Sequence, residues 1–397
     1  MKRTELRFFA AAAAALALCA PLALGQSGAT RPRRVNPVQP APSTTDNAAS
    51  TSRTPSVGAR PQGTTASAYA LLKQGQYEAA LREAEQITAA DAKNAEAWKI
   101  AGFAQRNLKR YADAAESLQR AYDLRREAKV EDPEAEDALA EAYALSESYE
   151  KALPLLVAST ARKGAPPRAG LLYLRGLAEV KTGRAADAER SFAAALRADP
   201  KDKGSLYYLG QMAFQKGDYT TAVNMFNRAT LVDPKLVQAW QLLTHAYLRR
   251  AQGATGPKAD ADYLAAVRAS ESLLRAQDSE ENAALHGQAL IFAKQYAPAA
   301  AALERAAAGD SASGATLYLL GFAHSRAKNF PKAIGALERA AAKTPDNAEI
   351  FRELGYVYEA SKQYSQALAA YERGQQLAPT DAYFKESAER VRPFAKQ

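Results

Sequence analysis

A pattern of apolar and small residues recurs about every 34 residues over most of this 397-residue chain. In residues 203–236 the spacing of these residues predicts two amphipathic helices, separated by a turn at Gly217-Asp218. A pair of helices this short cannot bury its own apolar face, so each pair needs a neighbour to complete its core. One face of the first helix carries Leu206, Leu209, Gly210 and Ala213, and one face of the second carries Tyr219, Ala222, Phe226 and Ala229.

Related pairs begin at residues 61, 95, 133, 169, 203, 237, 280, 314 and 348, and five of the eight intervals equal 34. The second carries Trp98, Gly102, Tyr111 and Ala114, and the ninth carries Leu354, Gly355, Tyr358, Ala367, Tyr371 and Pro379. This pattern resembles the tetratricopeptide repeat (TPR), in which a Trp-Leu-Gly-Tyr helix precedes an Ala-Phe-Ala-Pro helix. The resemblance implies an all-α fold, a right-handed α-solenoid of about nine helix-turn-helix repeats with a C-terminal capping helix.

We assign residues 64–397 to this solenoid, and three of its units are irregular. The first has no aromatic residue opening its first helix, the third lacks a closing proline, and the sixth carries about ten extra residues, Gln252–Ala261. Insertions in repeat arrays usually lie in loops, so we expect a loop there. The units are 61–94, 95–128, 133–166, 169–202, 203–236, 237–279, 280–313, 314–347 and 348–381, followed by a capping helix at 382–392.

The first 25 residues have the features of a secretory signal peptide. Basic residues precede an apolar stretch, Phe8–Leu24, and Ala23-Leu24-Gly25 fits a cleavage site. We therefore expect an exported, periplasmic or envelope-associated protein, although a retained membrane anchor stays open as an alternative. The bulky Leu18 before Cys19, which is the one cysteine in the chain, argues against lipidation. Residues 26–63 are rich in Pro, Ser, Thr and Arg, and we expect a disordered linker.

The net charge of +9 is concentrated near the N-terminus. Residues 1–60 carry eight Lys or Arg against two Asp or Glu, so the repeats are nearly balanced. A nucleic-acid-binding protein would carry its basic excess on the folded part, so this function is disfavoured. The basic cluster Arg31-Pro-Arg-Arg34 could contact anionic lipids or cell-wall polymers, although a solvated tether explains it more simply.

The sequence shows no grouping of residues that predicts catalysis or a metal site. The three histidines, His245, His286 and His324, lie in three different repeats without a metal-ligand spacing. No phosphate-binding loop or nucleophile elbow is present. We therefore predict no enzymatic activity and no cofactor.

The resemblance implies that the first helix of each repeat lines a concave groove. Aromatic, amide and hydroxyl side chains recur on the corresponding face, and such residues suit capture of a peptide or partner protein. We predict a protein-interaction scaffold for an envelope complex, such as a secretion, pilus, polysaccharide-export or outer-membrane assembly. A self-associating structural protein and an accessory subunit binding a glycan polymer are the alternatives. The predicted groove residues are Phe103, Tyr173, Tyr207, Gln211, Gln241, His245, Tyr318, Phe322, Arg352 and Tyr356.

Overall fold

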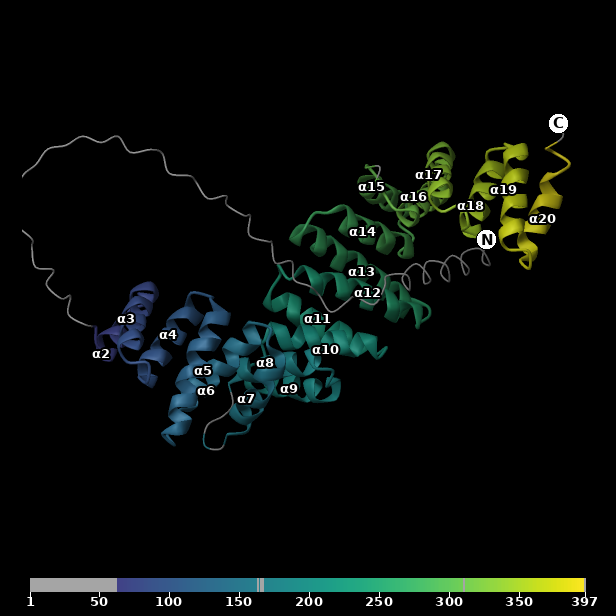
Figure 1. Cartoon of the computed structure of the whole chain (residues 1–397). Coiled ribbons are helices and arrows are strands. Elements are labelled where there is room, and N and C mark those ends of the chain that lie inside the picture. The colour runs from purple at the N-terminus through teal and green to yellow at the C-terminus, as the bar shows by residue number, and fades with distance from the viewer. Residues whose placement is uncertain (1–62, 163, 165–167, 310, 396–397) are drawn as a thin grey trace, which may run out of the picture. The chain divides into compact units, whose positions relative to one another are not determined.

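A computed structural model describes residues 63–162, 164, 168–309 and 311–395 of the chain. The predicted signal peptide and nearly all of the predicted linker lie outside these residues. The described part is all-helical and contains no strand, which confirms the predicted all-α repeat solenoid (Figure 1). Its helices belong to one compact unit, Pro61–Gln397.

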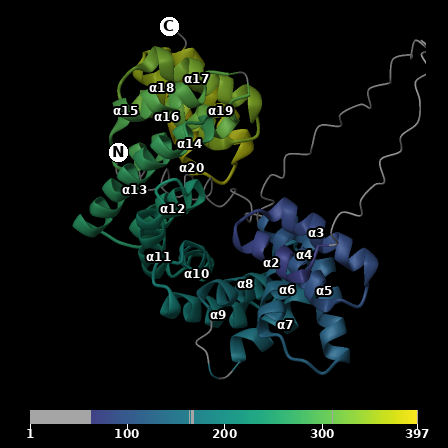
Figure 2. The ribbon, with the colours of Figure 1, turned by 90° about the vertical axis from the view of Figure 1, so that its left-hand side faces the viewer.

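The helices form nine antiparallel pairs followed by a single C-terminal helix, and Figure 2 shows the same succession from a second direction. They are α2 (Thr65–Lys73), α3 (Tyr77–Ala90), α4 (Ala95–Asn107), α5 (Tyr111–Glu127), α6 (Pro133–Leu145), α7 (Tyr149–Ala161), α8 (Ala169–Lys181), α9 (Ala185–Ala198), α10 (Lys203–Gln215), α11 (Tyr219–Val232), α12 (Val237–Gln252), α13 (Pro257–Ala276), α14 (Glu280–Phe292), α15 (Tyr296–Ala306), α16 (Gly314–Arg326), α17 (Phe330–Lys343), α18 (Ala348–Ala360), α19 (Tyr364–Leu377) and α20 (Ala382–Val391).

Each helix packs on the next one along the chain, so the even- and odd-numbered helices form two rows. Most even-numbered helices also contact the next even-numbered helix. The odd-numbered helices make no comparable contacts with one another in the described part of the chain. The even-numbered row, which holds the first helix of every repeat, is therefore the more closely packed of the two.

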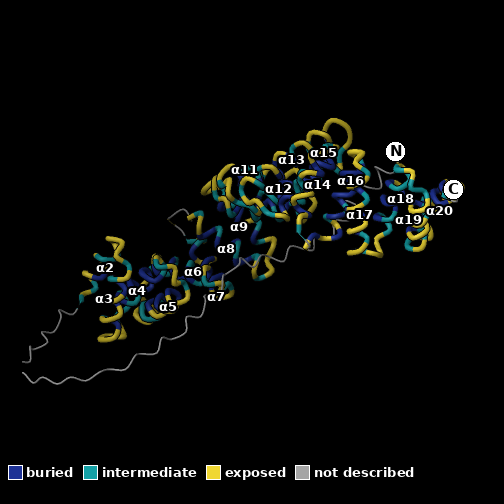
Figure 3. The backbone as a smooth tube through the Cα atoms, turned by 90° about the horizontal axis from the view of Figure 1, so that it is seen from above, coloured by how far each residue is buried: buried dark blue, intermediate teal, exposed yellow. Residues whose placement is uncertain are grey.

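Buried residues recur in every helix pair, as expected for an array in which each unit completes its neighbour's core (Figure 3). Close approach within a pair depends on small residues. A Cβ atom at Gly210 of α10 would lie 2.8 Å from Cε1 of Phe226 on α11, a ring that is fully buried. The same relation holds between Gly355 and Tyr371 in the ninth unit, because a Cβ atom at Gly355 would overlap the tyrosine ring.

A left-handed residue joins the two helices of every repeat except the sixth. It stands two positions after the first helix, and the next residue donates a backbone hydrogen bond to a carbonyl five residues earlier, as in Asp218 N to Ala213 O at 2.9 Å. This is the Schellman arrangement, which satisfies carbonyls at a helix end. The left-handed residues are Gly75, Lys109, Glu147, Gly183, Gly217, Lys294, Lys328 and Lys362.

The extra residues of the sixth unit lengthen its two helices, so the expectation of a long loop was wrong. The α12 helix has 16 residues and α13 has 20, whereas α10 and α11 have 13 and 14. Only residues 253–256 connect them. Pro257 at the start of α13 favours the added turns, because proline is tolerated in the first turn of a helix. The side chains of Arg250 and Asp262 pair across the lengthened hairpin at 2.6 and 2.8 Å.

The last helix, α20, covers the C-terminal end of the array. Phe384, Ala388 and Val391 are buried against the preceding pair, while Lys385 and Glu389 are exposed. A polar outer face at the end of a solenoid favours solubility. None of the described helices is both long enough and apolar enough to cross a membrane.

Candidate partner-binding surface

The fifth, ninth and twelfth residues of each even-numbered helix share one side of that helix, because they are three or four residues apart. We call the surface formed by these positions in α4 to α18 the first-helix face. All ten predicted groove residues occupy these positions. Seven of them remain at least partly accessible: Tyr173, Tyr207, Gln211, Gln241, His245, Tyr318 and Tyr356.

Two of the predicted rings, Phe103 and Phe322, are buried, which corrects the expectation that they are exposed. Phe103 is 7% accessible and packs against Leu118 and Ala138 of the next helices. Phe322 is 3% accessible, and the guanidinium of Arg326 lies 4.3 Å from its ring centroid. Both rings contribute to packing between repeats, so neither offers its surface to a partner.

Arg352 is also buried, with 5% of its surface accessible. Its guanidinium pairs with Glu349 at 3.0 Å and with Asp381 at the start of α20, and it lies 4.4 Å from the ring centroid of Tyr383. The pKa of Arg352 is raised: burial alone would lower it, but the two carboxylates outweigh that effect. The residue holds the capping helix in place and is not free to bind a partner.

The tyrosines of the fourth and fifth units form a cluster of rings. Tyr208 stacks on Phe192 with ring centroids 5.0 Å apart, and it lies 6.3 Å from Tyr173 and 5.5 Å from Tyr207. Tyr173 also rests on Gly204, where a Cβ atom would overlap the ring. Burial raises the pKa of each of the three tyrosines, so their hydroxyls stay protonated and act as neutral hydrogen-bonding groups.

The three histidines lie in separate surroundings. Burial, with a smaller effect of Arg249, lowers the pKa of His245 to about 4, so this imidazole is neutral near pH 7. The Nδ1 atom of His286 is 2.9 Å from the Ser270 hydroxyl, and Nε2 of His324 is 3.2 Å from a carboxylate oxygen of Glu304. No group of three metal-ligating side chains occurs among the residues that the structure describes.

Ion pairs link successive even-numbered helices near both ends of the array. In the second and third units, Lys99 pairs with Asp132 at 3.1 Å and Arg106 with Glu141 at 2.9 Å. Toward the C-terminus, Arg326 binds both carboxylate oxygens of Glu353, at 2.8 and 3.1 Å. These charged side chains therefore join successive repeats.

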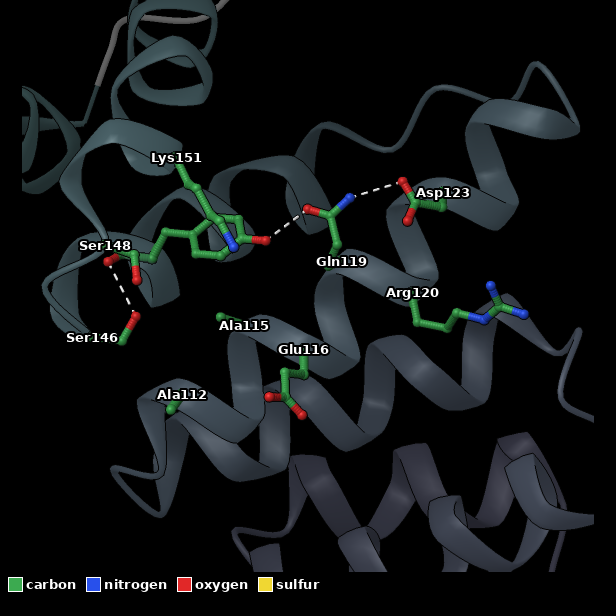
Figure 4. Close-up of a pocket in the computed structure, with 10 residues that line it drawn as sticks. Ala112, Ala115, Glu116, Gln119, Arg120, Asp123, Ser146, Ser148 and Lys151 are labelled. Carbon is green, nitrogen blue, oxygen red and sulfur yellow. Dashed lines mark hydrogen bonds between the residues drawn. The ribbon is translucent and has the colours of Figure 1, made fainter.

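A groove of about 460 Å³ lies away from the first-helix face, between α5 and the turn that joins α6 to α7 (Figure 4). Small residues, among them Ala112 and Ser146, leave the space. Three of its polar side chains are hydrogen-bonded to one another: the Tyr143 hydroxyl donates to Gln119 at 2.9 Å, and Gln119 donates to Asp123 at 2.8 Å. Sequence reasoning missed this groove, because it depends on small residues that carry no chemical signature.

The family model described as Tetratricopeptide repeat matches residues 65–129, 173–234 and 318–382. These stretches coincide with units one and two, four and five, and eight and nine, whereas the third, sixth and seventh units fall outside them. The six matched units are tetratricopeptide repeats. Arrays of these repeats typically serve as non-catalytic scaffolds for protein interactions.

Two curated relatives illustrate the similarity. Superkiller complex protein 3 of Mus musculus is 37% identical over 128 residues, covering 31% of this chain and 8% of the relative. Cellulose synthase operon protein C of Komagataeibacter xylinus is 36% identical over 78 residues, covering 20% of this chain and 6% of the relative. The chain thus spans less than a tenth of the length of either protein.

Solved structures with similar folds include YrrB, titled a TPR protein with an unusual peptide-binding site. It shares 15% identity with a TM-score of 0.44, covering 51% of this chain and 99% of YrrB. The MamA protein shares 19% identity with a TM-score of 0.40, covering 46% of this chain and 94% of MamA.

Proposed function

We propose that this TPR protein is a non-catalytic scaffold that binds a peptide or partner protein in a concave groove lined by the first-helix face. The observation that carries the proposal is the row of partly accessible aromatic and amide side chains on α10 and α12, namely Tyr207, Gln211, Gln241 and His245. Rings supply contact area at low entropic cost, and amides bind the backbone groups of an incoming chain. Since the charged ends of the face hold repeats together, the middle is the part left for a partner.

We further propose that the scaffold acts in the assembly of an envelope complex. Two observations support this: the signal-like residues 1–25, and the similarity to Cellulose synthase operon protein C, a relative named for a cellulose synthase operon. Export would place the repeats where secretion, pilus, polysaccharide-export or outer-membrane machinery assembles. Fractionation of cells producing the tagged full chain tests the location, and recovery in the cytoplasm alone would refute it.

Site-directed photocrosslinking tests the binding surface. A photoreactive phenylalanine analogue is placed at Gln211 or Gln241, and a control analogue is placed at Lys385 on the outer face of α20, which is also accessible. We expect the two groove positions to capture the same partner and the control to capture none of it. Equal capture from Lys385, or no capture from either groove position, would refute the proposed surface.

A further inference from the structure

Charge is distributed unevenly along the first-helix face. In α8, α10, α12, α14 and α16 none of the fifteen positions that form the face carries Asp, Glu, Lys or Arg. We call these positions the uncharged tract. Its members are Tyr173, Leu177, Val180, Tyr207, Gln211, Phe214, Gln241, His245, Leu248, Ala284, Gln288, Ile291, Tyr318, Phe322 and Ser325.

The same positions outside the tract are mostly charged. In α4 and α6 they include Lys99, Arg106, Asp137 and Glu141, and each of these residues is ion-paired within the array. In α18 they include Arg352 and Glu359, which pair with carboxylates and with Arg390, respectively. Charge on the face is therefore confined to its ends, where the array itself neutralises it.

The polar groups of the tract are amides, hydroxyls and one imidazole. Gln241 donates to Asn282 on α14 at 2.9 Å, while Gln211 and His245 remain half-buried. His245 adds no positive charge near neutral pH, because burial keeps its pKa low. Nearby charges on the same helices are the mutually paired Arg175 and Glu179, at 2.8 Å, and Arg249, which follows His245 by one turn. A further charge is Arg326 of α16, whose guanidinium lies 4.3 Å from the ring centroid of Phe322 and pairs with Glu353 at 2.8 Å.

The ring packing in the tract favours a peptide over a sugar polymer. Sugar rings bind by stacking on a free aromatic face, but the ring of Tyr173 already lies against Gly204. Tyr207 meets Tyr208 edge-on and lies 6.2 Å from the ring of Phe226. Because the rings pack on one another in this way, their edges and hydroxyls are the groups left to bind a partner. These groups suit the backbone amides and small apolar side chains of a peptide.

From this distribution we infer that the uncharged tract binds an extended, uncharged peptide segment of its partner, and this inference rests on the proposed function. A charged side chain placed against the tract would lose hydration without gaining an opposite charge, so charged segments are rejected. Successive even-numbered helices from α10 to α16 contact one another, and the axes of packed helices lie about 9 Å apart, so these three intervals span about 27 Å. An extended chain of about 3.3 Å per residue covers that span with about eight residues.

Selection from a random dodecapeptide phage library on the purified full chain tests the charge class. We expect the enriched peptides to contain Asp, Glu, Lys and Arg at less than about one third of the input frequency, because each buried unpaired charge costs roughly tenfold or more in affinity. A selected synthetic peptide should change its Kd less than about twofold between 50 and 500 mM NaCl, because salt screens only charged contacts. Enriched peptides as charged as the library would overturn the inference while leaving the scaffold function standing.

Matched variants show whether the selected peptide binds the tract. The double variant Gln211→Glu, Gln241→Glu places two carboxylates in the tract and should weaken binding by about tenfold or more. The control Lys385→Glu changes charge on the exposed face of α20 and should leave the Kd within about twofold, since exposed charges are screened there. Equal effects of both variants would overturn the inference.

A glycan arm separates the remaining outcomes, with cellohexaose as the probe. Binding of cellohexaose without enrichment of any peptide would refute the peptide class and favour a glycan-binding subunit. If neither probe binds and the photocrosslinks at Gln211 and Gln241 also fail, the scaffold function falls together with the inference. If the crosslinks succeed while the library yields no peptide, the inference alone is refuted.

Discussion

Replacing Arg326 with alanine would leave the carboxylate of Glu353 buried without its cation. Glu353 is 4% accessible and accepts hydrogen bonds from both terminal nitrogens of Arg326 and from the Ser325 hydroxyl at 2.6 Å. Burial raises the pKa of this carboxyl, and Arg326 and Ser325 partly offset that effect. The pair joins α16 to α18, so the substitution tests whether a buried ion pair holds neighbouring repeats together.

The size of the effect follows from protonation. Removing one partner of a buried ion pair costs about 3 to 5 kcal/mol. The variant can avoid part of this cost by binding a proton, and at pH 7 that costs about 3.7 kcal/mol for a carboxyl with an unfolded pKa near 4.3. We therefore expect a loss of about 3 to 4 kcal/mol at pH 7. In the folded variant the Glu353 carboxyl holds a proton that the unfolded chain releases at pH 7. Because binding this proton costs less as the pH falls, the loss of stability should shrink to about 1 kcal/mol at pH 5.

Urea unfolding followed by circular dichroism at both pH values measures the loss. Hydrogen exchange of α16 and α18 localises it, because a repeat array need not unfold in one step. The control Lys216→Ala breaks an exposed ion pair with Glu189, whose side chains are 58% and 46% accessible, and should cost less than about 0.5 kcal/mol. A loss below about 1 kcal/mol at pH 7 in Arg326→Ala, or a loss equal at both pH values, would refute the reasoning.

Three further predictions concern single residues. Gly355→Ala should lower the free energy of unfolding in urea by about 1 to 2 kcal/mol, because the new methyl group meets the ring of Tyr371. The control Gly335→Ala has open space around it and should raise that free energy by about 0.5 to 1 kcal/mol. Equal effects of the two variants would contradict the packing argument. The low folded pKa of His245 means that the unfolded state binds a proton first, so stability should fall by about 1 to 2 kcal/mol from pH 7 to pH 5, and His245→Gln should remove that part of the pH dependence. Gly256→Ala should cost about 1 to 3 kcal/mol in thermal unfolding, because φ at this N-cap is +62° and ψ is −145°, and an unchanged melting temperature would show that the turn relaxes.

Most of the fold could be predicted from the sequence, because each tetratricopeptide repeat carries its own start, turn and apolar stripe. Lys203 and Ala348, predicted as the first residues of two units, are the first residues of α10 and α18. The exception was Gln252–Ala261, where the extra residues suggested a loop because insertions in repeat arrays usually lie in loops. Pro257, a residue suited to the first turn of a helix, was the signal that could have indicated the longer helices.

The face that carries the candidate site could also be predicted, but the accessibility of its residues could not. Spacing within a helix determines the side on which a residue lies, while burial depends on residues of the neighbouring repeats. Phe103 is covered partly by Ala138, 35 residues later, and Arg352 is paired with Asp381, 29 residues later. Such contacts between units are invisible to a pattern read within one unit, which is why three of the ten predicted positions are buried.

The left-handed turns have a practical consequence. Five of the eight turns have Lys or Glu as the left-handed residue. The left-handed conformation costs a residue with a Cβ atom roughly 1 kcal/mol. Glycine would avoid that cost. Its greater conformational entropy in the unfolded chain would offset only part of the resulting stabilisation. Substitution by glycine at Lys109, Lys294, Lys328 and Lys362 would thus stabilise the protein one helix pair at a time and leave the first-helix face unaltered. A series of such stabilised variants would reveal whether binding a partner requires the array to bend.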